Sequence, residues 1–178
     1  MNPRDPARTD RSGFPHLDGL AQTRIQELVA LAMPLRSLRR TGRRPLPFNG
    51  ETLATVCGVT PSLPFWYEIN VHRTVVGSYL TDVRLFNKTA DELDLFWVQE
   101  HDELEDAVAY LERYDPAGDV TPPRQVAEIA SSPVELALRI ARLQLRVDQI
   151  TQHYRALVGD LLNTLSQADH QAGAKPAA

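Results

Sequence analysis

Hydrophobic and polar residues alternate in the middle of the chain, a pattern typical of β-strands. From Phe65 to Val71, apolar side chains occupy every second position, as in a strand with one buried face. A second β-rich run extends from Val75 to Phe86, and Leu93 to Val98 is a third candidate strand. The short connections favour antiparallel pairing. Gly77, inside the second run, predicts a bulge or a close backbone approach.

Three other segments carry helix signals. The first runs from Asp18 to about Leu35, and a short one from Glu51 to Cys57 is stopped by Gly58. The third opens at Asp102, which stands three residues before Glu105 as in a capping box. We therefore expect helices that pack on one face of the sheet.

The clearest pattern is a long helix near the C-terminus. Ser132 is a suitable N-cap, Pro133 suits the first helical position, and Glu135 suits the third. The helix can continue to about Gln167, roughly 35 residues or ~52 Å. Its apolar residues recur with alternating spacings of four and three, which defines a heptad seam: Leu136, Ile140, Leu143, Val147, Ile150, Tyr154, Leu157 and Leu161.

A heptad seam predicts a second helix alongside. The seam is also compatible with packing across the chain's own sheet and first helix. Leu138 and Leu145 lie off the seam, which suggests contact on more than one side. Because a ~52 Å helix exceeds the ~30 Å scale of a small domain, we expect part of it to project and to self-associate or bind a partner protein.

Together the patterns predict an α+β fold, with a small antiparallel three-stranded sheet, helices on one face and a long C-terminal coiled-coil-like helix. Tails that are small and polar are expected to be disordered. The predicted parts are a disordered N-terminal tail (1–15), an α+β domain (16–118) with an arginine-rich loop (36–44), a Pro-containing connector (119–132), the long amphipathic helix (133–167) and a disordered C-terminal tail (168–178).

The composition fits a soluble protein that folds without cross-links. The chain has 178 residues, 43% of them hydrophobic, and a chain of this length buries roughly 70% of its unfolded surface. The single cysteine, Cys57, cannot form an intrachain disulfide, and we expect it to be a small buried hydrophobe. The apolar run from Leu28 to Met33 is shorter than the ~20 residues of a membrane span. We expect a cytoplasmic protein without membrane contact.

Charge is strongly segregated, although the formal net charge is only −4. Residues 1–60 carry +4, residues 61–130 carry −9 and residues 131–178 carry +1. Within 91–119, eleven acids accompany a single base, Arg113. This distribution predicts one strongly acidic surface.

Near the N-terminus, five arginines fall within nine residues: Arg36, Arg39, Arg40, Arg43 and Arg44. Such a loop can contact phosphates or an acidic partner; alternatively it is solvated or docks on the chain's own acidic surface. The next segment, 51–62, contains Ala54 and Gly58-Val59 and resembles the Ala-x-x-x-Gly-Val core of helix-turn-helix DNA-binding motifs. Pro64 would limit its recognition helix to under about two turns.

No motif for catalysis, metal binding or cofactor binding stands out. The five histidines are scattered, and the glycines form neither a phosphate loop nor a dinucleotide turn. We therefore expect no catalytic residues, metal or cofactor. The remaining candidate is a ligand face on neighbouring strands, which is otherwise the solvated side of the sheet: Glu68, His72, Asp82 and Arg84.

These observations favour a non-enzymatic interaction protein, such as a subunit, adaptor or chaperone-like binder. It would associate with itself or another protein through the heptad helix and present an acidic surface at 91–119. The alternative is a nucleic-acid-binding regulator that uses the arginine-rich loop and the segment 51–62. A small enzyme or ligand-binding domain centred on the candidate ligand face is the third hypothesis.

Overall fold

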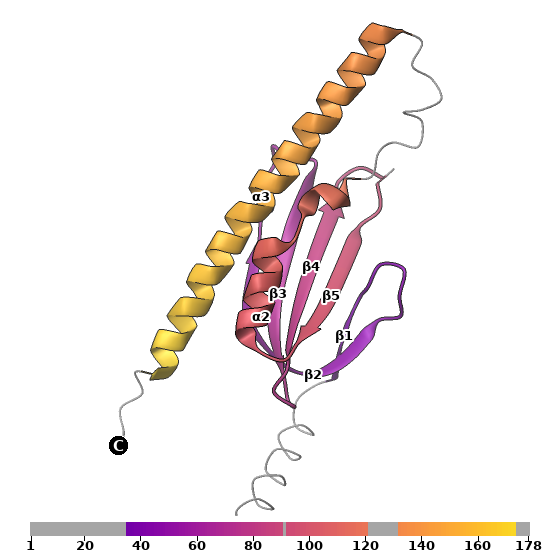
Figure 1. Ribbon diagram of the computed structural model, residues 1–178. Coiled ribbons are helices and arrows are strands. Elements are labelled where there is room, and N and C mark those ends of the chain that lie inside the picture. Colours follow the sequence, from indigo (N-terminus) through magenta and orange to yellow (C-terminus); the bar gives the residue numbers. More distant parts are fainter. Residues whose placement is uncertain (1–34, 91, 121–131, 174–178) are drawn as a thin grey trace, which may run out of the picture.

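The computed structural model describes residues 35–90, 92–120 and 132–173 (Figure 1). Five strands form one antiparallel sheet in the order β1-β2-β3-β4-β5. Their bounds are β1 Leu35–Leu38, β2 Leu46–Cys57, β3 Phe65–Thr74, β4 Tyr79–Asn87 and β5 Leu95–His101. Three helical elements follow: α2 (Leu104–Arg113), the 3-10 turn η1 (Pro116–Asp119) and the long helix α3 (Pro133–Gly173).

The three-stranded sheet predicted from the sequence is wrong, because five strands form a curled sheet that resembles half of a barrel. The predicted strands correspond to β3, β4 and β5, while β1 and β2 were not anticipated. The predicted short helix at 51–57 is also wrong, since this segment lies in β2 and pairs with β3 from Gly50↔Thr74 to Cys57↔Glu68. Pairing with a neighbouring strand has overridden the local helix signal.

Glycine shapes the sheet at a different place from the one predicted. Gly77 lies in the turn between β3 and β4 with a φ of 96°, and a Cβ there would meet open space. The close backbone approach occurs instead at Gly50 of β2, where a Cβ would collide with the carbonyl oxygen of Arg73. Gly50 thus lets β2 run tightly against the end of β3.

The main core lies between one face of the sheet and the helices. Figure 1 shows α2 and α3 lying across this face. From β3, Phe65, Tyr67 and Ile69 point into this core and are fully buried. The helices contribute Leu111 and a run of buried residues in the C-terminal half of α3: Ile150, Tyr154, Leu157, Val158, Leu161 and Leu165.

The β1–β2 hairpin folds over the opposite face of the sheet. Leu38 and Phe48 from the hairpin pack against Leu80 of β4 and form a second, smaller core. The hairpin loop also reaches the outer edge of β5. There the backbone N–H of Thr41 donates to the carbonyl of Phe96 at 2.9 Å, and Thr41 Oγ1 accepts from the Phe96 N–H at 2.7 Å.

The helix starts agree partly with the sequence pattern. Helix α2 begins at Leu104 with Glu103 as N-cap residue, and the cap residue makes no side-chain hydrogen bond, so the predicted capping box does not form. Helix α3 begins at Pro133, and the Glu135 N–H donates to Ser132 Oγ at 3.2 Å. It ends at Gly173 rather than near Gln167.

Other expectations fall outside the described residues. The predicted helix from Asp18 does so except for its last residue, Leu35, which belongs to β1. The N-terminal tail and most of the connector at 119–132 also lie outside. Among the helices that are described, none is long and apolar enough to cross a membrane.

Candidate functional site

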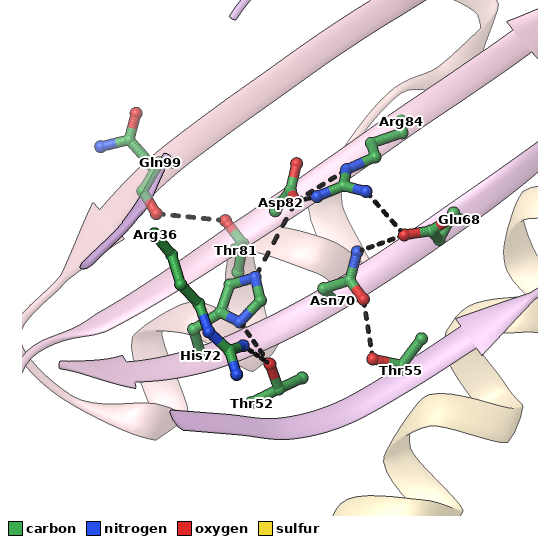
Figure 2. A network of polar contacts seen from close by, with 10 residues as sticks. All are labelled: Arg36, Thr52, Thr55, Glu68, Asn70, His72, Thr81, Asp82, Arg84 and Gln99. Atoms are coloured by element: carbon green, nitrogen blue, oxygen red, sulfur yellow. Dashed lines mark hydrogen bonds and ion pairs between the residues drawn. The ribbon is translucent and has the colours of Figure 1, made fainter. Parts of the chain in front are cut away.

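The candidate ligand face forms a connected polar network on the sheet face that the hairpin folds over (Figure 2). Strand β3 supplies Glu68, Asn70 and His72, which alternate with its buried apolar residues. Strand β4 supplies Asp82 and Arg84. Because the antiparallel register places Glu68 opposite Arg84 and Asn70 opposite Asp82, all five side chains share one face.

Arg84 joins the two carboxylates of this network. Its Nη1 donates to Glu68 Oε1 at 2.8 Å, and its Nε donates to Asp82 Oδ2, also at 2.8 Å. Burial acts to lower the pKa of Arg84, but the hydrogen bond and charge of Asp82, together with the charge of Glu68, raise it on balance. The guanidinium therefore stays charged and holds Asp82, which is 0% exposed.

His72 lies deeper in the network, at 4% exposure. Its Nδ1 is 3.0 Å from Thr52 Oγ1, and its Nε2 is 3.8 Å from Asp82 Oδ2. The Phe48 ring packs against the imidazole, with 5.0 Å between ring centroids. His72 Nε2 and Asp82 Oδ1 are buried atoms that lack a hydrogen-bond partner among the described residues. The buried side of the network thus contains two polar atoms whose hydrogen-bonding capacity is not used within the described residues.

Two exposed threonines of β2 border the network. In the sheet register Thr52 faces His72 and Thr55 faces Asn70, with a bulge between Thr52 and Ala54. Residues three apart in a regular strand point to opposite faces, so the bulge is what brings both threonines to the same face. Thr55 Oγ1 donates to Asn70 Oδ1 at 2.7 Å. Sequence reasoning missed these threonines because it placed them on a helix.

The arginine-rich loop belongs to the β1–β2 hairpin. Arg36 lies in β1 and its Nη1 donates to Thr52 Oγ1 at 2.8 Å, while the Arg39 guanidinium lies 4.3 Å from the Phe96 ring centroid. Arg43 and Arg44 are exposed. The ion pairs found within the described residues include none of the five arginines. The loop therefore docks on β5 through Thr41 and Arg39 and leaves Arg43 and Arg44 facing solvent.

Exposed acidic residues gather where β5 passes into α2: Glu100, Asp102, Glu103, Glu105, Asp106 and Glu112. An open depression of about 530 Å³ lies beside them, with His101, Tyr110 and Arg113 in its wall. Burial lowers the pKa of His101, against the effect of the Asp106 charge. The ring is accordingly neutral at pH 7, and this surface is acidic in character.

Asp119 differs from the exposed acids of the segment 91–119. Asp119 is buried and accepts hydrogen bonds from the hydroxyls of Tyr67, at 2.5 Å, and Tyr114, at 2.7 Å. Burial raises the pKa of Asp119, although the two hydrogen bonds act to lower it. Burial likewise raises the pKa of both tyrosines. This cluster fixes η1 to the sheet, a structural role that a count of surface charge does not reveal.

Cys57 does not fit the expectation made for it. It is the last residue of β2 and is exposed, so the prediction of a buried hydrophobe is wrong. Its neighbour Val56 faces the main core instead, because successive residues of a strand alternate between faces. Within the described ranges, no three His, Cys, Asp or Glu side chains are grouped to hold a metal ion.

The heptad seam of α3 divides into two halves. From Ile150 onward the seam residues are buried against the sheet. Before Ile150 the helix runs past the strands, as the orange part of α3 shows in Figure 1, and Leu136 and Ile140 are 40% and 46% exposed. We call residues 133–147 the projecting half and residues 150–165 the packed half.

A second apolar stripe runs along the projecting half only. Val134, Leu138 and Leu145 are 70%, 55% and 57% exposed. With Ala141 they repeat the spacing of four, three and four residues, on the side of the helix away from the seam. Comparisons of the chain with protein-family models, curated proteins and solved structures give no match.

Proposed function

We propose that this chain is a protein-interaction protein, a subunit, adaptor or chaperone-like binder, that associates through the projecting half of α3. The observation that carries the proposal is the exposure of large apolar side chains there, with Val134 at 70% and Leu145 at 57%. Contiguous apolar surface that remains exposed is typical of an interaction site. We expect it to act in the cytoplasm, which the presence of a single, unpaired cysteine supports.

The spacing of the exposed residues favours another helix as the partner structure. The seam residues Leu136 and Ile140 and the second stripe with Leu138 both follow the four-three spacing of helix packing. Since the stripes lie on opposite sides of α3, each fits a separate helix. An assembly of at least three helices would cover both.

Further copies of the chain are the partner that we expect, since each projecting half carries the same two apolar stripes. Within one chain Glu135 already pairs with Arg139 and Arg146 with Glu92, so apolar contact rather than charge drives the pairing. The exposed acids around α2 would remain free as a further surface for a basic partner.

Sedimentation velocity on the full chain across micromolar concentrations tests the proposal. The wild type is expected to associate. The double variants Leu136→Glu with Ile140→Glu and Leu138→Glu with Leu145→Glu are expected to weaken association, since each buries charge in a helix contact. Ala156→Glu is the matched control, because Ala156 is exposed on the packed half.

A strictly monomeric wild type, with the projecting half protected from hydrogen exchange, would contradict the proposal. Protection in a monomer would mean that another part of the same chain covers the apolar stripes of the projecting half. If only one of the two double variants weakens association, only one stripe contacts a partner and the assembly is a helix pair.

Nucleic acid is the alternative partner, and the exposed Arg43 and Arg44 support it. Phosphate contacts of this kind weaken steeply as salt increases. A filter-binding assay at low and moderate salt, with Arg43→Gln and Arg44→Gln as the comparison, separates the two hypotheses. Absence of binding at low salt removes this alternative.

A further inference from the structure

The Thr52 hydroxyl lies between a guanidinium that donates to it and a ring nitrogen that can accept its proton. Arg36 Nη1 donates to Thr52 Oγ1 at 2.8 Å, so the hydroxyl acts as acceptor there. Its own hydrogen is then available for His72 Nδ1, 3.0 Å away. The imidazole that accepts this hydrogen is the neutral tautomer with its proton on Nε2, and that nitrogen faces Asp82 Oδ2 at 3.8 Å.

Burial divides these three groups into an exposed threonine and a sheltered base. Thr52 is exposed, whereas His72 is 4% and Asp82 is 0% exposed. Arg84 contacts Asp82 Oδ2 through two nitrogens, Nε at 2.8 Å and Nη2 at 2.5 Å. Hydroxyl, imidazole and carboxylate in this order are the parts that activate a hydroxyl nucleophile.

Two buried atoms beside the contact between His72 and Asp82 lack a hydrogen-bond partner among the described residues, namely His72 Nε2 and Asp82 Oδ1. A charged imidazolium at His72 would be attracted to the Asp82 carboxylate, and a small rotation of the ring would convert the 3.8 Å contact into a hydrogen bond. The network is thus suited to a proton that moves onto His72.

We propose that Thr52 is a nucleophile that accepts an acyl group from small activated esters. Thr52 Oγ1 forms a bond to the carbonyl carbon while the bond from that carbon to the leaving oxygen breaks. The hydroxyl proton moves to His72 Nδ1 and then to the leaving oxygen. Water, deprotonated by the same nitrogen, later hydrolyses the Thr52 ester and restores the hydroxyl.

Other residues assist without taking part in bond changes. The guanidinium of Arg36 lies beside the reacting oxygen and stabilises negative charge that develops on the carbonyl oxygen. Asp82 is a positioning residue, because it acts through His72 and is buried away from any ester. This activity is independent of association through α3.

The test uses the full chain, p-nitrophenyl acetate and peptide mass mapping. An acetyl group is expected on Thr52 in the wild type and is expected to be absent from Thr52→Val, whose side chain has the same shape and suits a strand. Thr55→Val is the matched control: Thr55 is also exposed on β2, but its partner is the amide of Asn70, which is not a base.

The His72→Gln variant tests the base directly. Loss of a general base lowers rates by about 10²-fold or more, so acetylation of Thr52 should slow by that factor while background acetylation of lysine stays unchanged. Asp82→Asn should lower the limiting rate at saturating ester without changing the half-saturating concentration. Far-UV circular dichroism confirms that each variant is folded.

Two results would overturn the proposal. One is acetylation of Thr52 no faster than that of Thr55 in the wild type. The other is an unchanged total of acetyl groups in Thr52→Val. Because Thr52→Val is isosteric and exposed, neither result depends on a variant that fails to fold.

Discussion

The two halves of α3 share one helix and one seam but not one environment. In the packed half, Ile150 and Leu161 are 0% exposed, and in the projecting half Leu136 and Ile140 are 40% and 46% exposed. The packed half contacts the sheet and also the short helix α2, whose Leu111 carbonyl accepts a hydrogen bond from the Tyr154 hydroxyl at 2.9 Å. The comparison shows that a heptad spacing reports which side of a helix makes contact, while the nature of the contact is set by the fold.

The difference in exposure between the two halves follows from the length of α3. Helix α3 has 41 residues and is about 62 Å long at 1.5 Å per residue. Strand β3 has 10 residues, which span about 33 Å. The sheet can cover only part of such a helix, so apolar residues beyond its end stay exposed unless another chain or segment covers them.

The largest expected effect is a difference between the two halves in how much a leucine-to-alanine substitution lowers the free energy of unfolding. Leu161→Ala removes buried methyl groups and should lower the free energy of unfolding by about 2–5 kcal/mol. Leu138→Ala, in the projecting half, should change it by at most about 0.5 kcal/mol when the chain is too dilute to associate. Urea unfolding followed by circular dichroism measures both. Equal losses would show that both halves are packed within one chain.

The second expected effect is a loss of stability where Gly58 packs tightly against the packed half of α3. A Cβ on Gly58 would lie 2.5 Å from His153 Cε1 and 2.8 Å from Leu157 Cδ1. We expect Gly58→Ala to lower the free energy of unfolding by about 1–3 kcal/mol, because α3 must move away from β2. Gly118→Ala is the control, since a Cβ there meets nothing within 4 Å. A neutral Gly58→Ala would mean that α3 is loosely packed on the sheet.

Helix propensity predicts a smaller, opposite effect. Gly159 lies in α3 at an exposed position where a Cβ meets nothing within 4 Å. Gly159→Ala should therefore raise the free energy of unfolding, by about 1 kcal/mol. Thermal unfolding of the two proteins side by side measures the gain. A loss would place an unseen neighbour against that side of the packed half.

The smallest effect should come from pH. Burial lowers the pKa of His153 in the packed half, although the Gly58 backbone acts in the opposite direction. The unfolded chain, with an ordinary histidine pKa near 6.5, takes up a proton that the folded chain resists. Stability should therefore fall as the pH drops below about 6.5 and should not depend on this group above that value.

The variant His153→Gln isolates this contribution. Its stability should vary less between pH 7 and pH 5 than that of the wild type, as measured by urea unfolding at each pH. The difference between the two proteins cancels the contributions of His101 and Asp119, whose pKa values are also shifted. Parallel curves would indicate that His153 is not buried by the packed half.

Elements with a sustained apolar pattern were predictable from the sequence, whereas the number of strands was not. Strand β3 and helix α3 were predictable because their apolar periods persist over many residues. Strand β2 was not, because the bulge near Thr52 interrupts its alternation. Its pairing energy comes from β3, a partner that no local window contains.

The polar network was predictable only in part. Residues at every second position of β3 and β4 were expected to share a face, and the register places Glu68, His72, Asp82 and Arg84 there. The contact of His72 with Thr52 depends on the register of β2 and could not be read from spacing. The burial of Asp119 was hidden for a similar reason, since charge counts treat every acid as exposed.

The contact between Thr41 and Phe96 joins residues 55 positions apart, and with it the first hairpin to the last strand. Contacts between distant parts of a chain form slowly, because a long loop must close first. The hairpin that comes first in the sheet is thus expected to lock last, once β5 is in place. In a chain made from its N-terminus onward, the loop between β1 and β2 can dock only after β5 has been synthesised.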